Sequence, residues 1–356
     1  MRKPPQNNQM NSLGNWWQPE QFAVKRAILE ARAKILANLR SYFSNENFVE
    51  VDTPALQRSP CMEPHLHAFK TELQSPHGDT HPFYLATSPE FTCKKLLVAG
   101  MERIYQLSHM YRNAECSSKH HPEFMLLEWY RTGVGYDALM DDCEAILKAA
   151  CQVTQRTQCE YNGMRCDITK KATRITVADA FFKYADVDVL ASMDDVQHPS
   201  ATRIMAEATR IGVRTANDDT WDDVVLRIIG EKIEPHLGGD APCFLTDYPL
   251  PLAALARAKP SDPRVAERFE LYVCGLELAN AFVELTDASI QRERFESDMK
   301  LRKLRYGSDY PIDEEFLQAL EYGMPQAAGI ALGVDRLVML ATGAQHINDV
   351  LWSSVT

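Results

Sequence analysis

Residues 123–130 narrow the choice of folds, because their side chains alternate in character along the chain. In a β-strand, successive side chains point to opposite faces of the sheet. One face of this segment is uniformly apolar and consists of Met125, Leu127 and Trp129. The other face is mixed and carries Phe124, Leu126, Glu128 and Tyr130. We therefore expect a strand that buries one face in the core and lines a polar cleft with the other.

A long amphipathic helix is predicted near the N-terminus, after a flexible arm at residues 1–18. It should begin near Pro19, which suits a first helical turn. Apolar residues then recur with a period close to 3.6 as far as Phe43. A small core alone does not cover such a helix, so a partner subunit is a reasonable second surface. A strand should follow and end at Thr53-Pro54, at a sheet edge, because proline cannot donate to a ladder.

The remaining elements are predicted from periodicity and turn residues. Strands are expected at 103–112 and 123–131, a hairpin at 267–286, and a strand feeding a helix at 326–343. Helices are expected at 136–153, 289–305 and 313–322. Residues 174–240 mix helical stretches with loops and carry no recognisable chemistry.

Composition excludes several classes of protein. The 356 residues include 38 Lys and Arg against 49 Asp and Glu, a net charge of -11, which disfavours binding to RNA as the main function. The N-terminus lacks the apolar region of a signal peptide, and no segment is apolar enough for a membrane span. The 9 Cys form no CxxC pair, so we expect reduced thiols in a cytoplasmic protein. The histidines at 65, 67, 77 and 81 do not follow the spacing of a fixed tetrahedral ligand set, so zinc is not expected.

Three segments carry candidate chemistry, and the first is the loop that follows Arg112. This arginine ends a predicted strand, where its guanidinium could hold a phosphate or carboxylate bidentately. A lone arginine is more often an exposed residue in a salt bridge. Its setting, rather than its residue type, must decide between the two.

The second segment is the hairpin of residues 269–285, with Gly275 near its middle. Folding back there would make Glu270 and Glu277 approximate cross-strand neighbours. Two adjacent carboxylates repel each other unless a cation lies between them. A metal site and an exposed acidic hairpin both remain open, although an exposed hairpin rarely holds so many apolar residues. Beyond the turn, Asn280, Phe282 and Glu284 share a face.

The third segment, residues 329–337, is a strand of small residues that opens a helix. Gly333 lets the backbone approach a ligand closely. The start of a helix offers unpaired N–H groups and a partial positive charge to an anion. Arg336 would add a full charge at that point. The spacing GxxxG alone usually reflects packing, whereas GxxxGxDR after a strand is more specific.

In this order, the segments resemble the signature motifs of the class II aminoacyl-tRNA synthetases. The strand ending at Thr53-Pro54 resembles motif 1, residues 112–128 resemble motif 2, and residues 329–337 resemble motif 3. The resemblance runs from about residue 20 to the C-terminus. It implies an α/β (α+β) catalytic domain at 19–356, with an antiparallel sheet flanked by helices, and a homodimer.

The lysyl branch of this class is the most similar one, through Ser88-Pro89-Glu90, His120-His121-Pro122-Glu123-Phe124 and residues 277–285. Lysyl-tRNA synthetases carry an anticodon-binding OB domain before the catalytic domain, where this chain has about 18 residues. With this short N-terminal segment, and with Ala331 in place of glycine in motif 3, the chain resembles the elongation factor P–lysine ligase family. Members of that family attach (R)-β-lysine to a lysine of elongation factor P.

The resemblance implies ATP and Mg²⁺ as cofactors, and it implies roles for individual residues. Catalytic residues would be Arg112, Glu277 and Arg336. The implied ATP-binding set is Arg112, Asn113, Ala114, His121, Phe124, Glu277, Leu278, Gly333 and Arg336, with magnesium on Glu270 and Glu277. The amino acid would contact Ser88, Pro89, Glu90, Tyr130, Asn280 and Glu284. Elongation factor P would be the acceptor, with no tRNA expected.

Two positions depart from the family pattern. Motif 2 usually reads Arg-Asn-Glu, and here it reads Arg112-Asn113-Ala114-Glu115; Glu115 could take the place of the usual glutamate after a one-residue shift of the loop. The usual His-Asn-Pro is His120-His121-Pro122. Two alternatives stay open: an enzyme that charges tRNA with lysine, and a catalytically inactive regulatory relative, which Ala114 favours.

Overall fold

The computed structural model describes residues 16–355. The sequence predicted a flexible arm at residues 1–18, and residues 1–15 of that arm lie outside the described residues. The first helix, α1 (Pro19–Asn45), begins at the proline that the sequence indicated. Its buried residues are spaced three or four apart, as an amphipathic helix requires, and are Leu29, Arg32, Ile35, Leu39 and Phe43. The predicted long helix is therefore confirmed, and an arginine lies within its buried stripe.

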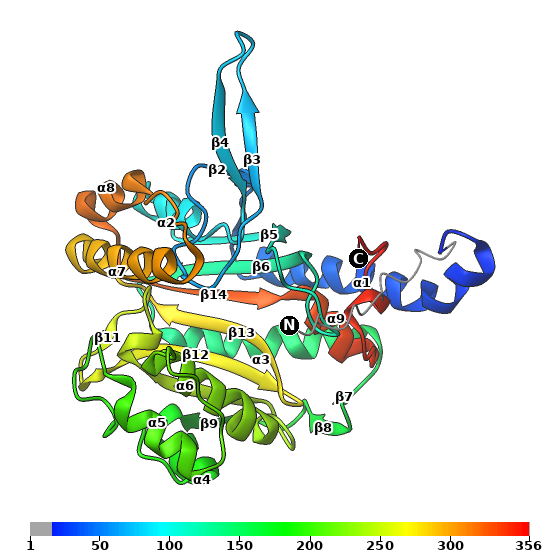
Figure 1. Cartoon of the computed structure of the whole chain (residues 1–356). Coiled ribbons are helices and arrows are strands. Elements are labelled where there is room, and N and C mark those ends of the chain that lie inside the picture. Colours follow the sequence, from blue (N-terminus) through cyan, green and yellow to red (C-terminus); the bar gives the residue numbers. More distant parts are fainter. Residues whose placement is uncertain (1–15, 356) are drawn as a thin grey trace, which may run out of the picture.

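A large, mainly antiparallel sheet forms the centre of the molecule (Figure 1). Its strands lie in the order β1 (Val49–Glu50), β5 (Arg103–Tyr111), β6 (Glu123–Thr132), β14 (Ala327–Gly333), β13 (Leu276–Val283), β12 (Asp262–Val273), β10 (Cys243–Pro249) and β9 (Thr173–Thr176), and β11 (Ala258–Lys259) pairs with β12. Only the outermost pairs along this order, β1 with β5 and β9 with β10, are parallel. The predicted antiparallel fold is confirmed, and the strand before Pro54 lies at a sheet edge as expected.

One face of the sheet is covered by α1, α3 (Tyr136–Val153) and α9 (Val334–Thr342). Leu127 and Trp129 of β6 belong to this core, and Met125 packs against it. The apolar face predicted for residues 123–130 is therefore the core face. The opposite face of β6 carries Glu128 and Tyr130, and this is the face that was predicted to line a polar cleft.

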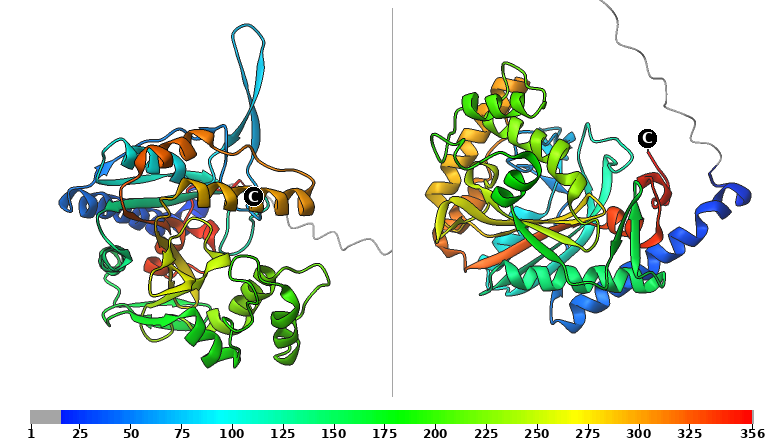
Figure 2. Two further views of the ribbon diagram at one scale, coloured as in Figure 1. Left: turned by 90° about the vertical axis from the view of Figure 1, so that its left-hand side faces the viewer. Right: turned by 90° about the horizontal axis from the view of Figure 1, so that it is seen from below.

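A second group of helices stands at one end of the strands, where α7 (Ala288–Tyr306) and α8 (Glu314–Gly323) lie beside α2 (Glu90–Val98) (Figure 1). The sequence predicted α7 and α8 but not α2. It also missed the hairpin of β3 (Lys70–Gln74) and β4 (Thr80–Leu85), which pairs with β2 (Leu56–Gln57) and projects from the body (Figure 2). A further small hairpin consists of β7 (Gln158–Tyr161) and β8 (Met164–Asp167).

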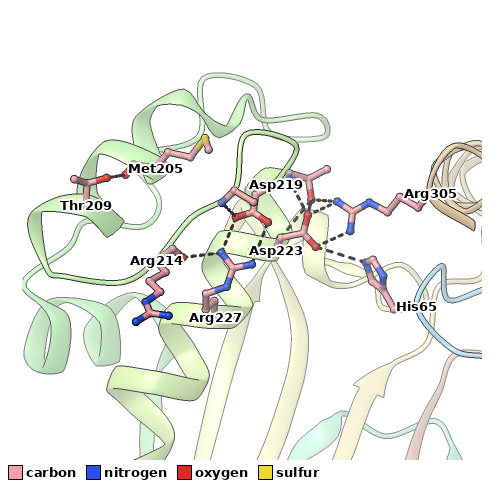
Figure 3. A network of polar contacts seen from close by, with 10 residues as sticks. His65, Met205, Thr209, Arg214, Asp219, Asp223, Arg227 and Arg305 are labelled. Carbon is pink, nitrogen blue, oxygen red and sulfur yellow. Dashed lines mark hydrogen bonds and ion pairs between the residues drawn. The ribbon is translucent and has the colours of Figure 1, made fainter. Parts of the chain in front are cut away.

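Residues 174–240 build a smaller core of their own around Trp221. Its helices are α4 (Val177–Ala185), α5 (Ala201–Arg210) and α6 (Trp221–Ile228), and it packs on β10. Short helical turns are η1 (Ile229–Ile233) and η2 (Glu234–His236) here, and η3 (Leu250–Leu252) and η4 (Ile347–Asp349) elsewhere. Figure 3 shows how this unit is tied to α7: Arg305 donates to Asp223 at 2.8 Å, and His65 Nε2 lies 3.9 Å from the same carboxylate.

All nine cysteines carry free thiols, and seven of them are buried. Among residues 16–355, none of the helices combines the length and the apolar character that crossing a bilayer requires.

Candidate active site

The register of the sheet brings three polar residues and an alanine, from four neighbouring strands, into one row. Glu270 of β12 pairs with Asn280 of β13, which pairs with Ala331 of β14, which pairs with Glu128 of β6. Residues that face each other across antiparallel strands share one face of the sheet. A second row on the same face consists of Arg268, Phe282, Gly329 and Tyr130. The polar face of β6 therefore belongs to a continuous surface across the middle of the sheet.

The hairpin of β12 and β13 differs slightly from its predicted register. Glu277 pairs with Tyr272, and the register shifts between Leu271 and Tyr272. Glu270 and Glu277 are consequently diagonal rather than directly opposite neighbours. The turn is a two-residue one in which Cys274 has φ 54° and Gly275 has φ 67°, both left-handed, as the tightest hairpins require. Both glutamates still border the same cavity.

This cavity has a volume of about 330 Å³ and lies over the cleft face of the sheet. It contains four positively charged side chains, Arg112, Lys119, Arg268 and Arg336. The predicted site residues that line it are Arg112, His121, Phe124, Glu270, Glu277, Leu278, Asn280, Gly333 and Arg336. Five carboxylate residues line the cavity as well, Glu63, Glu115, Glu270, Glu277 and Asp335. The cationic side chains can pair with phosphate oxygens, and the carboxylates can take a cation that accompanies the phosphates.

Arg336, in the first turn of α9, is held by the hairpin and by the loop before β6. Its guanidinium donates to the carbonyl oxygen of Glu277 at 2.7 Å and lies 3.4 Å from Glu277 Oε2. It also lies 2.7 Å from His120 Nε2. Burial and the charge of Arg336 lower the pKa of His120 to about 4. His120 is therefore neutral at physiological pH, and its Nε2 can accept a hydrogen bond from Arg336.

Arg112 and Phe124 lie together on the opposite wall. The Arg112 guanidinium lies 5.0 Å from the centre of the Phe124 ring, within the range of a cation–π contact. Its Nε donates to the carbonyl oxygen of Thr87 at 3.4 Å. Among residues 16–355, no carboxylate lies within ion-pair distance of this guanidinium, so its charge is available for an anionic ligand.

Glu270 is occupied by partners that the sequence analysis did not assign. Its Oε1 accepts from Arg268 at 2.6 Å and its Oε2 from Tyr272 at 2.7 Å, and Arg268 also donates to Asn280 at 3.0 Å. Burial and the neighbouring Glu277 raise the pKa of Glu270. Arg268 stands two residues before Glu270 on the same face of the strand, so this partner was within reach of period-two reasoning.

Two carboxylates at the cavity are compatible with magnesium, but they could not hold it alone. Among residues 16–355, no group of three or more His, Cys, Asp or Glu side chains is arranged to hold a metal ion. The Glu277 side chain is 38% exposed, whereas both Glu270 oxygens are already hydrogen-bonded. Magnesium in nucleotide sites typically takes one or two carboxylates and completes its shell with phosphate oxygens and waters. The donor set fits that use, with Glu277 as the more accessible ligand.

A buried cluster of carboxylates lies farther along the same face of the sheet. Glu90 and Glu284 are bridged by the ammonium of Lys94, whose Nζ lies 2.5 Å from each. Glu128 accepts hydrogen bonds from Ser88 and Tyr130, both at 2.7 Å.

Burial raises the pKa of two of these carboxyl groups. The pKa of Glu284 rises to about 8, chiefly through burial, against the opposing effect of Lys94. Burial and the charge of Glu90 raise the pKa of Glu128 to about 7. An ammonium group of a ligand would favour the ionised forms of these carboxyl groups, since Lys94 is the one ammonium in contact with the cluster among the described residues.

Gly329 allows this cluster to form. A Cβ atom at this position would lie 2.3 Å from Glu284 Oε1 and 2.4 Å from Cε1 of Tyr130. Neither atom belongs to an exposed, freely moving side chain, because Glu284 and Tyr130 are both almost fully buried. The glycine here is required by close approach rather than by backbone conformation.

The comparisons with known proteins agree with this geometry. The sequence pattern of the tRNA synthetases class II (D, K and N) matches residues 21–353. The elongation factor P–(R)-β-lysine ligase of Pectobacterium carotovorum is 39% identical over 340 residues, covering 95% of this chain and 97% of the relative. The ligase of the same name from Vibrio cholerae is 39% identical, covering 90% and 93%. That from Photorhabdus laumondii is 38% identical, covering 98% and 99%. The chain belongs to the elongation factor P–(R)-β-lysine ligase family.

The two departures from the family motifs have structural counterparts in the loop before β6. Ala114 is left-handed, with φ 64°, and its backbone N–H donates to the side chain of Asn113 at 2.9 Å. Neither Asn113 nor Ala114 lines the cavity, whereas Glu115 does. His121 borders the cavity, but its ring is buried and contacts the Glu123 carbonyl at 2.5 Å and Ser354 at 3.2 Å. Their roles in ATP binding stay predictions.

Sequence reasoning missed several members of the site. Lys94, Lys119 and Arg268 received no role, and Glu128 was placed on the polar face without one. Lys94 follows Glu90 by four residues, a spacing that puts both on one side of a helix. That signal is available in the sequence only once α2 is recognised as a helix. Pro89 and Ser88 stand at the start of α2, and Glu90 N donates to Ser88 Oγ at 3.0 Å.

Proposed function

We propose that this chain activates (R)-β-lysine with ATP and transfers it to the ε-amino group of a lysine of elongation factor P. One observation carries the proposal. A cavity with four cationic side chains and a buried cluster of three carboxylates lie on the same face of one sheet. A triphosphate with its metal ion and a diamino acid, which together form an adenylate, need such sites side by side: cationic side chains for the phosphates and carboxylates for the ammonium groups.

In the first half-reaction, the carboxylate of β-lysine attacks the α-phosphorus of ATP, and pyrophosphate leaves. Both partners are anions, so fixed positive charge must offset their repulsion and hold them in line. Arg112 would contact the α-phosphate and the carboxylate, and Arg336 would reach the far end of the triphosphate. The ring of Phe124 would stack on the adenine, and Glu115 would replace the usual motif 2 glutamate.

Magnesium would supply further positive charge on the phosphates, with Glu277 and Glu270 as its protein ligands. The amino groups of β-lysine would lie in the carboxylate cluster, one near Glu90 and the other near Glu284 and Tyr130, while Asn280 would help to place the carboxylate. Ser88 and Pro89 would shape this end of the pocket through the start of α2.

In the second half-reaction, the lysine ε-amine of elongation factor P attacks the carbonyl carbon of the adenylate. An amide bond forms, the bond to phosphate breaks, and AMP leaves with the electron pair. No protein nucleophile is required. The names of the relatives support β-lysine and elongation factor P as the substrates.

The purified full chain tests this proposal in two assays. It should exchange labelled pyrophosphate into ATP when (R)-β-lysine is present, and it should add one β-lysyl group to elongation factor P, detected by intact mass. Exchange with neither β-lysine nor α-lysine would refute amino-acid activation. Aminoacylation of bulk tRNA with lysine, without modification of elongation factor P, would establish the tRNA-charging alternative.

We further propose that residues 19–356 work as one catalytic domain and that the enzyme is a cytoplasmic homodimer. Three apolar side chains on one part of the molecule are largely exposed: Trp17 in the turn before α1 (64%), Val24 on α1 (83%) and Val49 on the edge strand β1 (51%). Apolar residues this exposed suit an interface between two copies. Light scattering should give twice the chain mass, and a monomer mass at micromolar concentration would contradict the dimer. Recovery of the native enzyme in a membrane or extracellular fraction would contradict the location.

A further inference from the structure

Lys94 is an unusual residue for a protein interior. It lies on α2 and is fully buried, and its ammonium touches the carboxylates of Glu90 and Glu284, both at 2.5 Å. A buried ammonium without partners would cost several kcal/mol, so a lysine is kept inside only when it is paired. Burial by itself would lower the pKa of Lys94, but Glu284 and Glu90 outweigh it and raise the pKa. Lys94 is therefore a permanent cation within the pocket proposed for β-lysine.

The two carboxylates that Lys94 contacts come from different parts of the chain. Glu90 opens α2, and Glu284 directly follows β13. Glu284 Oε2 forms an ion pair with Lys94, and within the described part of the chain neither oxygen of Glu284 has a hydrogen-bond partner; Oε1 has no ion-pair contact either. That oxygen is fully buried and thus lacks water as well. A buried carboxylate oxygen without a donor is costly, so this atom is suited to receive a donor from a ligand.

Lys94 also opposes the protonation of this carboxylate. Its charge lowers the pKa of Glu284, while burial, Glu90 and Glu128 raise it. Among the described residues, the groups with charge or titratable protons around Lys94 and its partners are Glu63 before β3, Glu90 and Cys93 on α2, Arg112 after β5, Glu128 and Tyr130 on β6, and Glu284 after β13. Lys94 contributes the cation in direct contact with Glu284.

We propose that Lys94 is a positioning residue of the amino-acid pocket: its ammonium holds the carboxyl groups of Glu90 and Glu284 in place to receive the ammonium groups of the substrate. This inference rests on the proposed function. Lys94 contacts substrate only through these two carboxylates, so it is not a catalytic residue. A purely structural role, as a link between α2 and β13, is the competing explanation.

The test compares Lys94→Met with Lys95→Met. Lys95 is the next residue on the same helix, but its ammonium pairs with Asp313 at 3.2 Å and Glu315 at 2.7 Å, away from the pocket. Pyrophosphate exchange is measured against (R)-β-lysine and against ATP from pH 6.5 to pH 9. In Lys94→Met, KM for β-lysine should rise roughly tenfold or more at pH 7, because a buried charge pair has lost one partner. KM for ATP should stay within about twofold, a difference of less than 0.5 kcal/mol.

The pH profile separates positioning from a structural role. Without the Lys94 ammonium, Glu284 should ionise only at higher pH, so the pH at which KM for β-lysine improves should move upward by about one unit or more. Lys94→Arg, which keeps the charge, should keep the pH profile of the unmodified chain. Lys95→Met should leave both KM values and the profile unchanged.

Several results would overturn the inference. Lys94→Met could raise both KM values together with an unchanged pH profile, which is the signature of a structural role. Its KM for β-lysine could also stay unchanged. Circular dichroism checks that Lys94→Met is folded. If it is not, Lys94→Arg becomes the test, and an upward shift in the pH dependence of its KM for β-lysine would refute the inference. Absence of exchange in the unmodified chain would refute the proposed function, and this inference with it, whereas active unmodified protein with indifferent variants would refute the inference alone.

Discussion

At the scale of single residues, the carboxylate cluster depends on a missing side chain as much as on the charged ones. Gly329→Ala would introduce a Cβ at 2.3 Å from Glu284 and 2.4 Å from the Tyr130 ring, closer than real contacts allow. One of the two side chains must move out of the pocket. We expect KM for β-lysine to rise roughly tenfold or more, because a buried charged partner is displaced. KM for ATP should change little, and both are measured by pyrophosphate exchange.

Gly230→Ala is the matched control for this substitution. Gly230 lies in a short helical turn of the 174–240 unit and has an ordinary backbone conformation, and a Cβ added there would meet no atom within 4 Å. Alanine there should be neutral or slightly stabilising, by up to about 1 kcal/mol. Equal effects of the two substitutions on KM for β-lysine would contradict the role assigned to Gly329.

The charged residues of the site differ in whether the sequence alone could indicate them. Arg112, Glu277 and Arg336 could be predicted because each stands at the end of a recognisable local pattern. Lys94 and Arg268 could not, since their importance comes from partners in other segments: Glu284 lies 190 positions after Lys94. The one-residue offset of Glu277 also required the extra residue of β13 at the register shift, Leu278, which the sequence does not indicate.

At the scale of elements, one buried ion pair joins three of them. Arg32 of α1 contacts Asp335 of α9 at 2.5 Å, and Asp335 accepts from the backbone N–H of Met125 in β6 at 2.8 Å. Both side chains are about 3% exposed. Arg32→Met should lower the free energy of unfolding by about 3–5 kcal/mol, because it leaves a carboxylate buried without its cation. Urea unfolding followed by tryptophan fluorescence measures the change.

Arg26→Met supplies the control on the same helix. Arg26 pairs with Glu30 at 2.8 Å, but the two side chains are 68% and 57% exposed, so the substitution should cost less than about 0.5 kcal/mol. If Arg32→Met were no more destabilising than Arg26→Met, the ion pair would not hold the three elements together.

Long elements with a clear period were predictable, and short or exposed ones were not. The helix at residues 136–153 and the strand–helix unit at 326–343 emerged with nearly their observed bounds, because a single hydrophobic period runs through each. The β3–β4 hairpin was missed, since its strands project from the body and their side chains are mostly exposed. Without a buried face, the period-two pattern that identifies a strand is absent.

At the scale of the whole molecule, the fold buries two carboxyl groups, Glu128 and Glu284, in a place that water hardly reaches. The pKa of Glu284 is raised to about 8 and that of Glu128 to about 7, mainly by burial, above an ordinary value of 4.5. A carboxyl group whose pKa is raised by folding stabilises the fold fully only below its unfolded value. That contribution is lost as pH rises through the folded pKa. The free enzyme should therefore lose stability between about pH 4.5 and pH 8 through these two groups.

Binding of β-lysine should reverse this tendency, because ammonium groups favour the ionised carboxylates. At pH 7 the complex would then hold fewer protons than the free enzyme, and binding would release them to the buffer. Calorimetric titration with β-lysine, in buffers of different ionisation enthalpy, measures the number released. We expect net release at pH 7, falling toward zero by about pH 9, where both carboxyl groups are already ionised. A heat of binding that is the same in all buffers at pH 7 would show that the cluster does not exchange protons with the substrate.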